Sequence, residues 1–460
     1  MPANFVLLQR IELNASAASV TFANIPQTGY TDLKVVVSAR TDYNAAVASL
    51  GVYLNTAASD TSYRWLRGNG AVAASGNDTS RLDFYVGEVP ALTATASTFS
   101  NTEIYIPNYT GSQQKSMSAD SVSEQNGTTA YAYFSAGLCT KTAAINSVTV
   151  RGFEGTGNLV SGSTFSLYGL AALGTTPVIA PKASGGNRID YDGTYWIHTF
   201  NTSGTFTPQT ALSCDYLVVA GGGGGGTANF AARGSGGSGG GGGGAGGFRT
   251  GTGLSVLAQS YSITVGAGGA GVTNTSGLKG SNSVFSTITS TGGGFGGGDS
   301  NNGSTVVGGA GGSSGGSCGW NTTSTSAGTA ASPAGEGNAG GGIIVSGGQR
   351  AAAGGGGASA AGGGASMPFP TPNASGGAGG AGLSNSYSGT AVTYAGGGGG
   401  VSPFGGVAGG AGGGGAGVLG GNGTNGTVNL GGGGGGALND SGTSTGGSGG
   451  SGIVIIRYLA

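Results

Sequence analysis

The chain has 460 residues, of which 109 are glycine, 16 are Lys or Arg and 17 are Asp or Glu. Its net charge is −1 and it has no basic cluster, which argues against nucleic-acid binding, because such proteins group Lys and Arg against phosphates. The three cysteines, at 139, 214 and 318, are far apart and form no C-x-x-C motif, which argues against a disulfide framework or a zinc site.

Glycine is distributed unevenly along the chain. Residues 1–210 hold 19 glycines and residues 211–460 hold the other 90, so the composition changes near residue 210. The N-terminus lacks a basic start followed by an apolar stretch, and we expect neither a signal peptide nor a transmembrane span. The two halves are therefore interpreted separately.

The first half predicts an antiparallel β-domain over residues 1–172. Short runs rich in Val, Ile, Tyr, Phe and Thr alternate with turn residues, and no stretch has a helical period. So many short strands in one domain indicate a two-sheet β-sandwich of jelly-roll type. The expected strands are 5–13, 19–25, 32–40, 49–55, 81–87, 101–109, 130–138, 145–153 and 163–171.

One aromatic group in this half has two interpretations. Trp65 lies between Arg64 and Arg67 in the sequence SYRWLRG, where it could stack on a sugar or bind a partner protein. The alternative is a core tryptophan between two solvated arginines. The acidic residues of this half occur singly at turns and strand ends, so we expect no catalytic pair there.

A Pro- and Gly-containing linker is expected at 173–188, followed by a glycine-rich domain at 189–460. That domain opens with aromatic residues around His198, the only histidine of the chain, which we interpret as structural. Two strong strands, DYLVVA (215–220) and IVIIRY (453–458), enclose the glycine blocks. We expect these strands to pair, which makes the blocks one large insertion between neighbours.

The glycine blocks alternate with short Ser-, Thr-, Asn- and Ala-rich segments, which is an internal repeat. Polyglycine is either a flexible linker or a helix of the polyproline-II kind, with three residues per turn and no internal hydrogen bonds. Adjacent helices of that kind satisfy one another only where no Cβ keeps their backbones apart. Because a linker does not need strong strands at both ends, the sequence favours a polyglycine-II bundle.

In such a bundle the segments between blocks become loops at its ends, where binding residues usually lie. Exposed aromatic residues together with Asn and Ser resemble the composition of antibody paratopes. The alternative is that each aromatic side chain covers the end of the bundle. The predicted receptor-binding residues are Phe230, Trp320, Asn321, Met367, Phe369, Tyr387, Tyr394 and Phe404.

The pattern TFNTSGTFT, DYLVVAGGGGGG, YSITVGAGGAG and GGSGIVIIRY, over about 190–460, resembles the glycine-rich domains of bacteriophage tail-fibre and receptor-binding proteins. The first half resembles β-sandwich modules of virion structural proteins. The resemblance implies a protein of the virion, made in the host cytoplasm. It further implies attachment to other virion proteins, a homotrimer, and binding of a bacterial surface glycan or outer-membrane protein through the loops.

Two other functions stay open. The protein could be a capsid decoration or head fibre without a dedicated receptor. It could also be a surface-polysaccharide hydrolase, which needs two carboxylates a few ångströms apart. The only acids of residues 211–460 are Asp215, Asp299, Glu336 and Asp440, each isolated in sequence. We therefore expect no enzyme, no catalytic residue, no cofactor and no metal site.

Overall fold

The structure is a computed structural model, and the part of the chain that it describes is all-β, without an α-helix. No described helix is long and apolar enough to cross a membrane. Contacts divide the chain into two units. The N-terminal unit comprises Met1–Lys182, Asn187–Trp196 and Leu459–Ala460, and the glycine-rich unit comprises Ala183–Gly186 and Ile197–Tyr458. The described residues are 5–124, 130–172, 180–229, 239–298, 305–320, 323–346, 350–367, 375–439 and 442–460.

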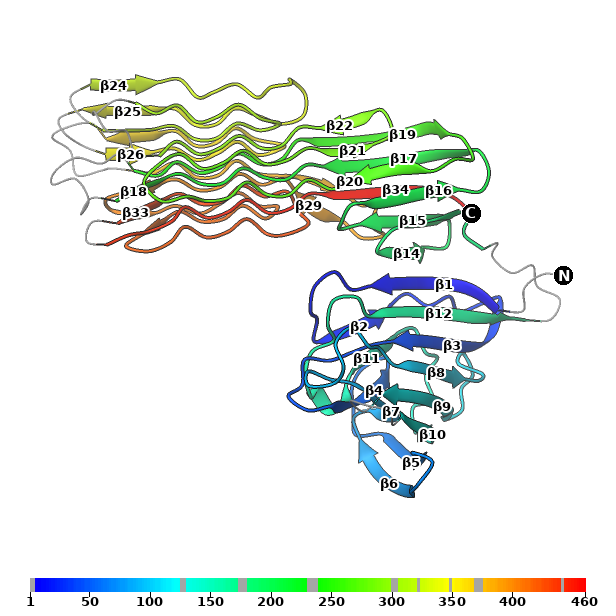
Figure 1. Cartoon of the computed structure of the whole chain (residues 1–460). Coiled ribbons are helices and arrows are strands. Elements are labelled where there is room, and N and C mark those ends of the chain that lie inside the picture. The colour runs from blue at the N-terminus through cyan, green and yellow to red at the C-terminus, as the bar shows by residue number, and fades with distance from the viewer. Residues whose placement is uncertain are drawn as a thin grey trace. The chain divides into compact units, whose positions relative to one another are not determined.

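The N-terminal unit consists of two antiparallel sheets that share one apolar core (Figure 1). The smaller sheet has the order β2 (Ser19–Phe22), β11 (Val148–Gly152), β4 (Val47–Leu54) and β7 (Phe84–Pro90). The larger sheet has the order β14 (Arg188–Tyr191), β1 (Phe5–Glu12), β12 (Thr164–Ala171), β3 (Tyr30–Ser38), β8 (Asn101–Ile106), β9 (Lys115–Glu124), β10 (Ala130–Cys139), β5 (Thr61–Gly68) and β6 (Ala73–Arg81).

The core of this unit follows from alternation along the strands, because successive side chains point to opposite faces of a sheet. Val35 and Val37 of the larger sheet and Val52 and Phe84 of the smaller sheet are completely buried between the two. The nine predicted strands are all present, with shifted ends. Of the other four strands in these sheets, β5, β6 and β9 were not predicted, and β14 lies at the start of the segment that the sequence assigns to the glycine-rich domain.

The glycine-rich unit begins and ends in strands that form what we call its sheet end. β17 (Leu212–Val219) and β34 (Ile453–Leu459) pair antiparallel, with Val219 opposite Ile453, so the predicted pairing is confirmed. The sheet that contains β17 and β34 continues to β19 (Phe248–Val256) beside β17 and to β15 (Tyr195–Phe200) beside β34. A second sheet has the order β13 (Ala183–Ser184), β16 (Gly204–Pro208), β20 (Tyr261–Thr264), β21 (Ser283–Phe285) and β22 (Ile288–Ser290). A hairpin of β28 (Leu383–Asn385) and β29 (Val392–Tyr394) completes this end.

Short strands form the opposite end of the same unit, which we call the hairpin end (Figure 1). They are joined in small antiparallel and parallel pairs rather than in one large sheet. The strands are β18 (Thr227–Asn229), β23 (Cys318–Trp320), β24 (Thr323–Ser326), β25 (Ile343–Ser346), β26 (Arg350–Ala352), β27 (Ala365–Met367), β30 (Val401–Ser402), β31 (Gly405–Gly406), β32 (Val418–Leu419) and β33 (Ala437–Asn439).

Between these ends the glycine blocks run side by side and donate hydrogen bonds to one another. Along residues 221–226, the segment that accepts the backbone N–H changes from one residue to the next. The same acceptor segment returns at every third residue. The N–H groups of Gly221 and Gly224 donate to the segment 278–281, at 3.0 and 2.9 Å. The N–H groups of Gly222 and Gly225 donate to the segment 447–450. The N–H groups of Gly223 and Gly226 donate to the segment 241–244. The block is therefore bonded to three separate neighbours in turn.

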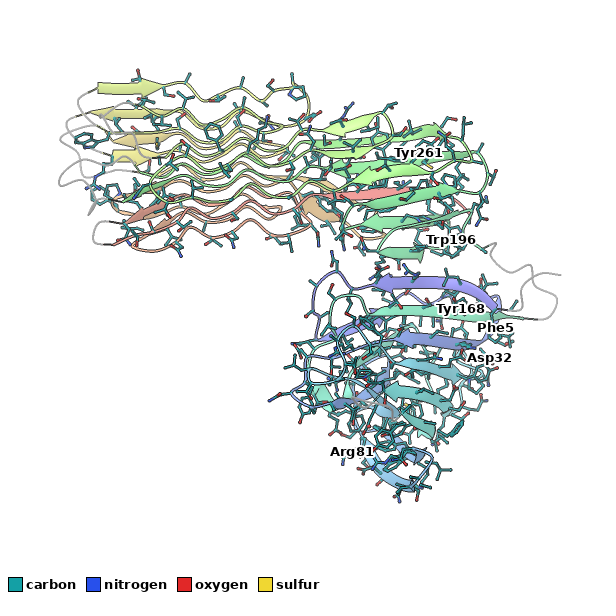
Figure 2. The ribbon with its side chains drawn as sticks, in the orientation of Figure 1. Phe5, Asp32, Arg81, Tyr168, Trp196 and Tyr261 are labelled. Carbon is teal, nitrogen blue, oxygen red and sulfur yellow. The ribbon has the colours of Figure 1, made fainter. Side chains whose placement is uncertain are left out.

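Close backbone approach explains why these positions are glycine. A Cβ at Gly223 would lie 2.1 Å from the carbonyl oxygen of Gly294, and one at Gly222 would lie 2.1 Å from that of Gly432. Neither neighbour is among the hydrogen-bond acceptors of the block, so further segments surround it at the Cβ positions. Figure 2 shows the consequence, with side chains dense over the N-terminal unit and sparse along the blocks.

Candidate functional site

The hairpin end is fixed in place by small apolar clusters that continue the glycine blocks. Ala228, Val401 and Leu438 pack together and join β18, β30 and β33. A second cluster joins β25, β26 and β27 through Ile343, Val345, Ala351, Ala353 and Ala365. Both clusters combine alanines with larger aliphatic side chains, and all of these residues are buried. The hairpins therefore project from a rigid base.

Phe404 lies on a tight turn at this end and its side chain is 63% exposed. Val401 pairs with Gly406 and Ser402 pairs with Gly405, which leaves Pro403 and Phe404 as the two central residues of the hairpin. Proline is favoured at the first central position of a turn, and Gly405 has φ +152°, which suits glycine. The Ser402 hydroxyl accepts the N–H of Phe404 at 3.4 Å. The sequence SPFG thus presents the ring to solvent.

Trp320 ends β23 at the hairpin end, opposite Arg350 of β26, and its side chain is half-buried. Met367 ends β27, opposite Val345, and its side chain lies outside the described part of the structure. Three other predicted residues, Phe230, Asn321 and Phe369, lie outside the described residues. The last described residues before these three are Asn229, Trp320 and Met367, all at the hairpin end.

The two tyrosines of the predicted set lie at the sheet end instead. The guanidinium of Arg457 stacks on the ring of Tyr387, with 3.9 Å between its central carbon and the ring centroid. The same guanidinium donates to the Asp215 carboxylate at 3.1 Å, so Tyr387 covers an ion pair between β34 and β17. Tyr394 is only 2% exposed, and burial raises the pKa of its phenol. The structure therefore separates these tyrosines from Trp320 and Phe404.

In the N-terminal unit, Trp65 packs against the apolar core. Its ring lies 6.1 Å from that of Tyr85 and 6.4 Å from that of Tyr133, measured between centroids. Arg67 stacks on Trp65 and donates to the Tyr133 hydroxyl at 3.4 Å. Arg64 lies on the opposite face of β5 and is exposed. Trp65 is therefore a half-buried residue packed against the core, and Arg67 is bound by its neighbours rather than solvated.

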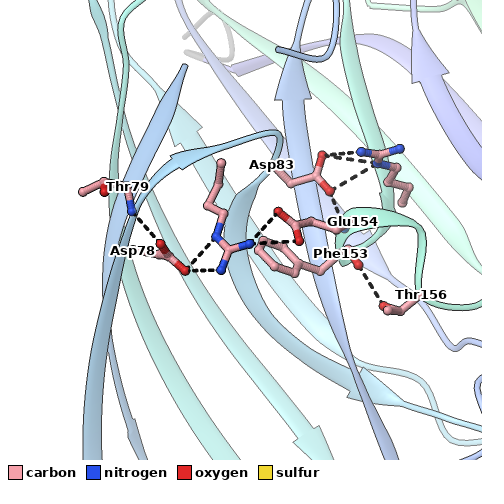
Figure 3. A network of polar contacts seen from close by, with 8 residues as sticks. Asp78, Thr79, Asp83, Phe153, Glu154 and Thr156 are labelled. Carbon is pink, nitrogen blue, oxygen red and sulfur yellow. Dashed lines mark hydrogen bonds and ion pairs between the residues drawn. The ribbon is translucent and has the colours of Figure 1, made fainter. Parts of the chain in front are cut away.

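A group of carboxylates in the N-terminal unit is bound by arginines (Figure 3). Asp83 is completely buried and accepts from Arg151 at 3.1 and 3.2 Å, and from the backbone N–H of Glu154. Arg81 bridges Asp78 and Glu154, at 2.5 and 3.2 Å. Each acid is saturated by cations or N–H groups, which secures the turn after β11. The network is therefore structural.

Two acids of the glycine-rich unit lie in the described ranges, Asp215, which Arg457 binds, and Glu336. Glu336 is 6% exposed, and its carboxylate accepts the N–H of Thr291 at 2.7 Å. Arg249 lies 3.9 Å from the other carboxylate oxygen, so Glu336 ties neighbouring segments together. Asp299 and Asp440 lie outside the described residues. Within the described ranges, no three His, Cys, Asp or Glu side chains converge as a metal site would require.

Two residues with a bearing on binding were not predicted. Phe134 of β10 and Leu66 of β5 are 64% and 61% exposed and lie opposite each other on the larger sheet of the N-terminal unit. The alternation in AYAYFSAGL identifies the strand, but it does not reveal which face stays open to solvent.

A family model described as a glycine-rich domain matches residues 200–459. No curated protein matches the chain by sequence.

Proposed function

The chain belongs to the glycine-rich domain family, which accounts for residues 200–459, and on that premise we propose that it is a virion fibre protein that binds a bacterial surface. In this proposal the N-terminal unit attaches to the virus particle. The hairpin end of the glycine-rich unit contacts a glycan or an outer-membrane protein of the host.

We further propose that the blocks are polyglycine-II helices and that the N-terminal unit is a jelly roll. The repeat of hydrogen-bond partners at every third residue supports the first assignment, because that helix has three residues per turn. The two antiparallel sheets around one core support the second.

The exposure of Phe404 at the tip of a rigid hairpin carries the functional proposal. A large aromatic ring that is 63% exposed contributes nothing to the core of its own unit. Aromatic side chains are over-represented among the residues that dominate binding interfaces. The buried cluster of Ala228, Val401 and Leu438 and the pairing of β30 with β31 hold the backbone of the hairpin in position, which lowers the entropy cost of binding.

The test uses the fluorescently labelled full chain, titrated onto a panel of bacterial isolates. We expect saturable binding to at least one isolate, and loss of about tenfold in affinity for Phe404→Ala and for Trp320→Ala. Leu257→Ala is the matched control, because Leu257 is 62% exposed and follows β19 at the sheet end. The proposal fails if the folded protein binds no isolate, or if all three variants bind like the wild type.

A further inference from the structure

A groove of about 670 Å³ lies on the outer face of the larger sheet of the N-terminal unit. It crosses β6, β5, β10 and β9, and the strand register defines two rows of side chains along it. One row consists of Ser75, Leu66, Phe134 and Asp120, and the next consists of Asn77, Arg64, Ala136 and Ser118.

The small side chains of the second row create the hollow. Ala136 and Ser118 leave space beside Phe134, which stands on the adjacent position of the same face. A smaller cavity of about 150 Å³ shares Ser118 and Asp120 with the groove and extends over β8 and β3. The two hollows therefore adjoin each other across the strands, and we refer to them together as the trough.

Polar groups in the trough differ in whether they are already bonded. The Lys34 ammonium pairs with Glu103 at 2.6 Å in the smaller cavity. By contrast, the side chain of Asp120 makes no hydrogen bond or ion pair with any described residue. Among the described residues, the Arg64 guanidinium donates only to the carbonyl of its neighbour Tyr63, at 2.9 Å. A carboxylate acceptor and guanidinium donors thus remain available on either side of Phe134.

We propose that this trough binds a neutral oligosaccharide. An exposed ring beside a hollow offers a stacking surface for the C–H face of a sugar, and Asp120, Arg64 and Asn77 offer hydrogen bonds to its hydroxyls. Pockets of 300–1,000 Å³ with a few fixed polar groups are typical of small-ligand sites. The opposite charges of Arg64 and Asp120 balance, which favours a neutral ligand.

A peptide strand would pair with the free edge of β6, whereas the trough lies on the side-chain face of the sheet, so strand addition would leave the trough unfilled. The site lies in a different unit from the hairpin end, and its ligand does not depend on the proposed function. Each proposal can therefore fail without the other.

The test titrates the full chain by calorimetry with maltohexaose, cellohexaose, mannohexaose and xylohexaose. We expect at least one probe to bind, and Phe134→Ala and Asp120→Asn each to lower its affinity about tenfold. Both side chains are exposed, so the melting temperature should not change. Leu138→Ala is the matched control, because Leu138 is exposed on the same face of β10 outside the groove.

Failure of all four probes overturns the proposal, and so does equal binding by the wild type and both groove variants. Light scattering then measures the oligomeric state of the wild type and of Phe134→Ala. If the wild type is an oligomer that Phe134→Ala dissociates, the face is an interface between copies of this chain, and the oligosaccharide proposal is wrong. The proposal is supported if Leu138→Ala binds the sugar like the wild type while Phe134→Ala and Asp120→Asn bind it more weakly.

Discussion

His198 shows how a single polar side chain is accommodated inside the glycine-rich unit. The ring is completely buried and lies against Phe206 and Tyr458. Its Nδ1 lies 2.7 Å from the carbonyl of Gly185, which can only accept, so Nδ1 carries the proton. Nε2 then accepts from the Tyr458 hydroxyl at 3.1 Å, and that hydroxyl accepts the N–H of Ala183. A neutral imidazole with its proton on Nδ1 satisfies every bond of this chain.

Burial lowers the pKa of His198 from 6.5 to about 4, and this shift predicts a pH dependence of stability. Between these two values the unfolded chain binds the proton and the folded chain does not, so the free energy of unfolding falls as the pH drops from 6.5 to 4. The loss amounts to about 3 kcal/mol. Above pH 6.5 this contribution is fully present.

Urea unfolding of the wild type and of His198→Gln at several pH values measures the effect. We expect the wild type to lose stability over this window more steeply than the variant, which has no imidazole to protonate. Parallel curves for the two proteins would show that His198 does not titrate on unfolding.

Among the elements, the glycine blocks are stabilised by close backbone contacts, and at positions such as Gly222 and Gly223 a side chain would disrupt them. The substitution Gly223→Ala places a methyl group 2.1 Å from a backbone oxygen and must force segments apart. We expect a loss of about 3 kcal/mol or more, and a drop of about 6 °C or more in the melting transition of this unit.

Gly421→Ala is the matched control, because its Cβ would lie 3.4 Å from its nearest neighbour, an ordinary contact. We expect this variant to change stability by less than about 1 kcal/mol. Differential scanning calorimetry of the full chain gives both values. Equal melting of Gly223→Ala and Gly421→Ala would mean that the blocks are not closely packed.

The sequence patterns predicted where strands form better than they predicted which segments lie next to one another. The strands 215–220 and 453–458 were identified and correctly paired, because both are strongly apolar. β9 was missed because serine alternates with Met, Ala and Val in it, and serine has weak strand propensity. Pairing with β8 and β10 overrides that propensity.

The neighbours of each glycine block could not be predicted from composition, because glycine has no side chain to distinguish one block from another. The hairpins and flanking strands set the register instead. For the same reason, the sequence did not show that the predicted receptor-binding residues lie at two different ends of the unit. Their loops look alike in sequence, yet Phe404 lies at the hairpin end and Tyr387 at the sheet end.

At the scale of the whole molecule, the two units are stabilised by different forces. The N-terminal unit buries Val, Ile, Leu, Phe and Tyr side chains between sheets. The glycine-rich unit has an aromatic cluster at its sheet end and relies along its blocks on hydrogen bonds between backbones. Such bonds contribute only about 1 kcal/mol each, while ordering a residue's backbone costs about 1–2 kcal/mol. The blocks therefore need the strands at both ends to align them.

We infer that the glycine blocks form a rigid scaffold rather than a flexible linker. Amide hydrogen exchange of the full chain measures whether the backbone N–H groups of the blocks are held in stable hydrogen bonds. Mass spectrometry of peptides covering 221–226 and 241–247 would be compared with peptides from β17 and β34. We expect the block amides to be protected as strongly as those of the two strands, since each donates to a backbone carbonyl of a neighbouring segment. Exchange of the block amides at the rate of an unstructured peptide would contradict this inference.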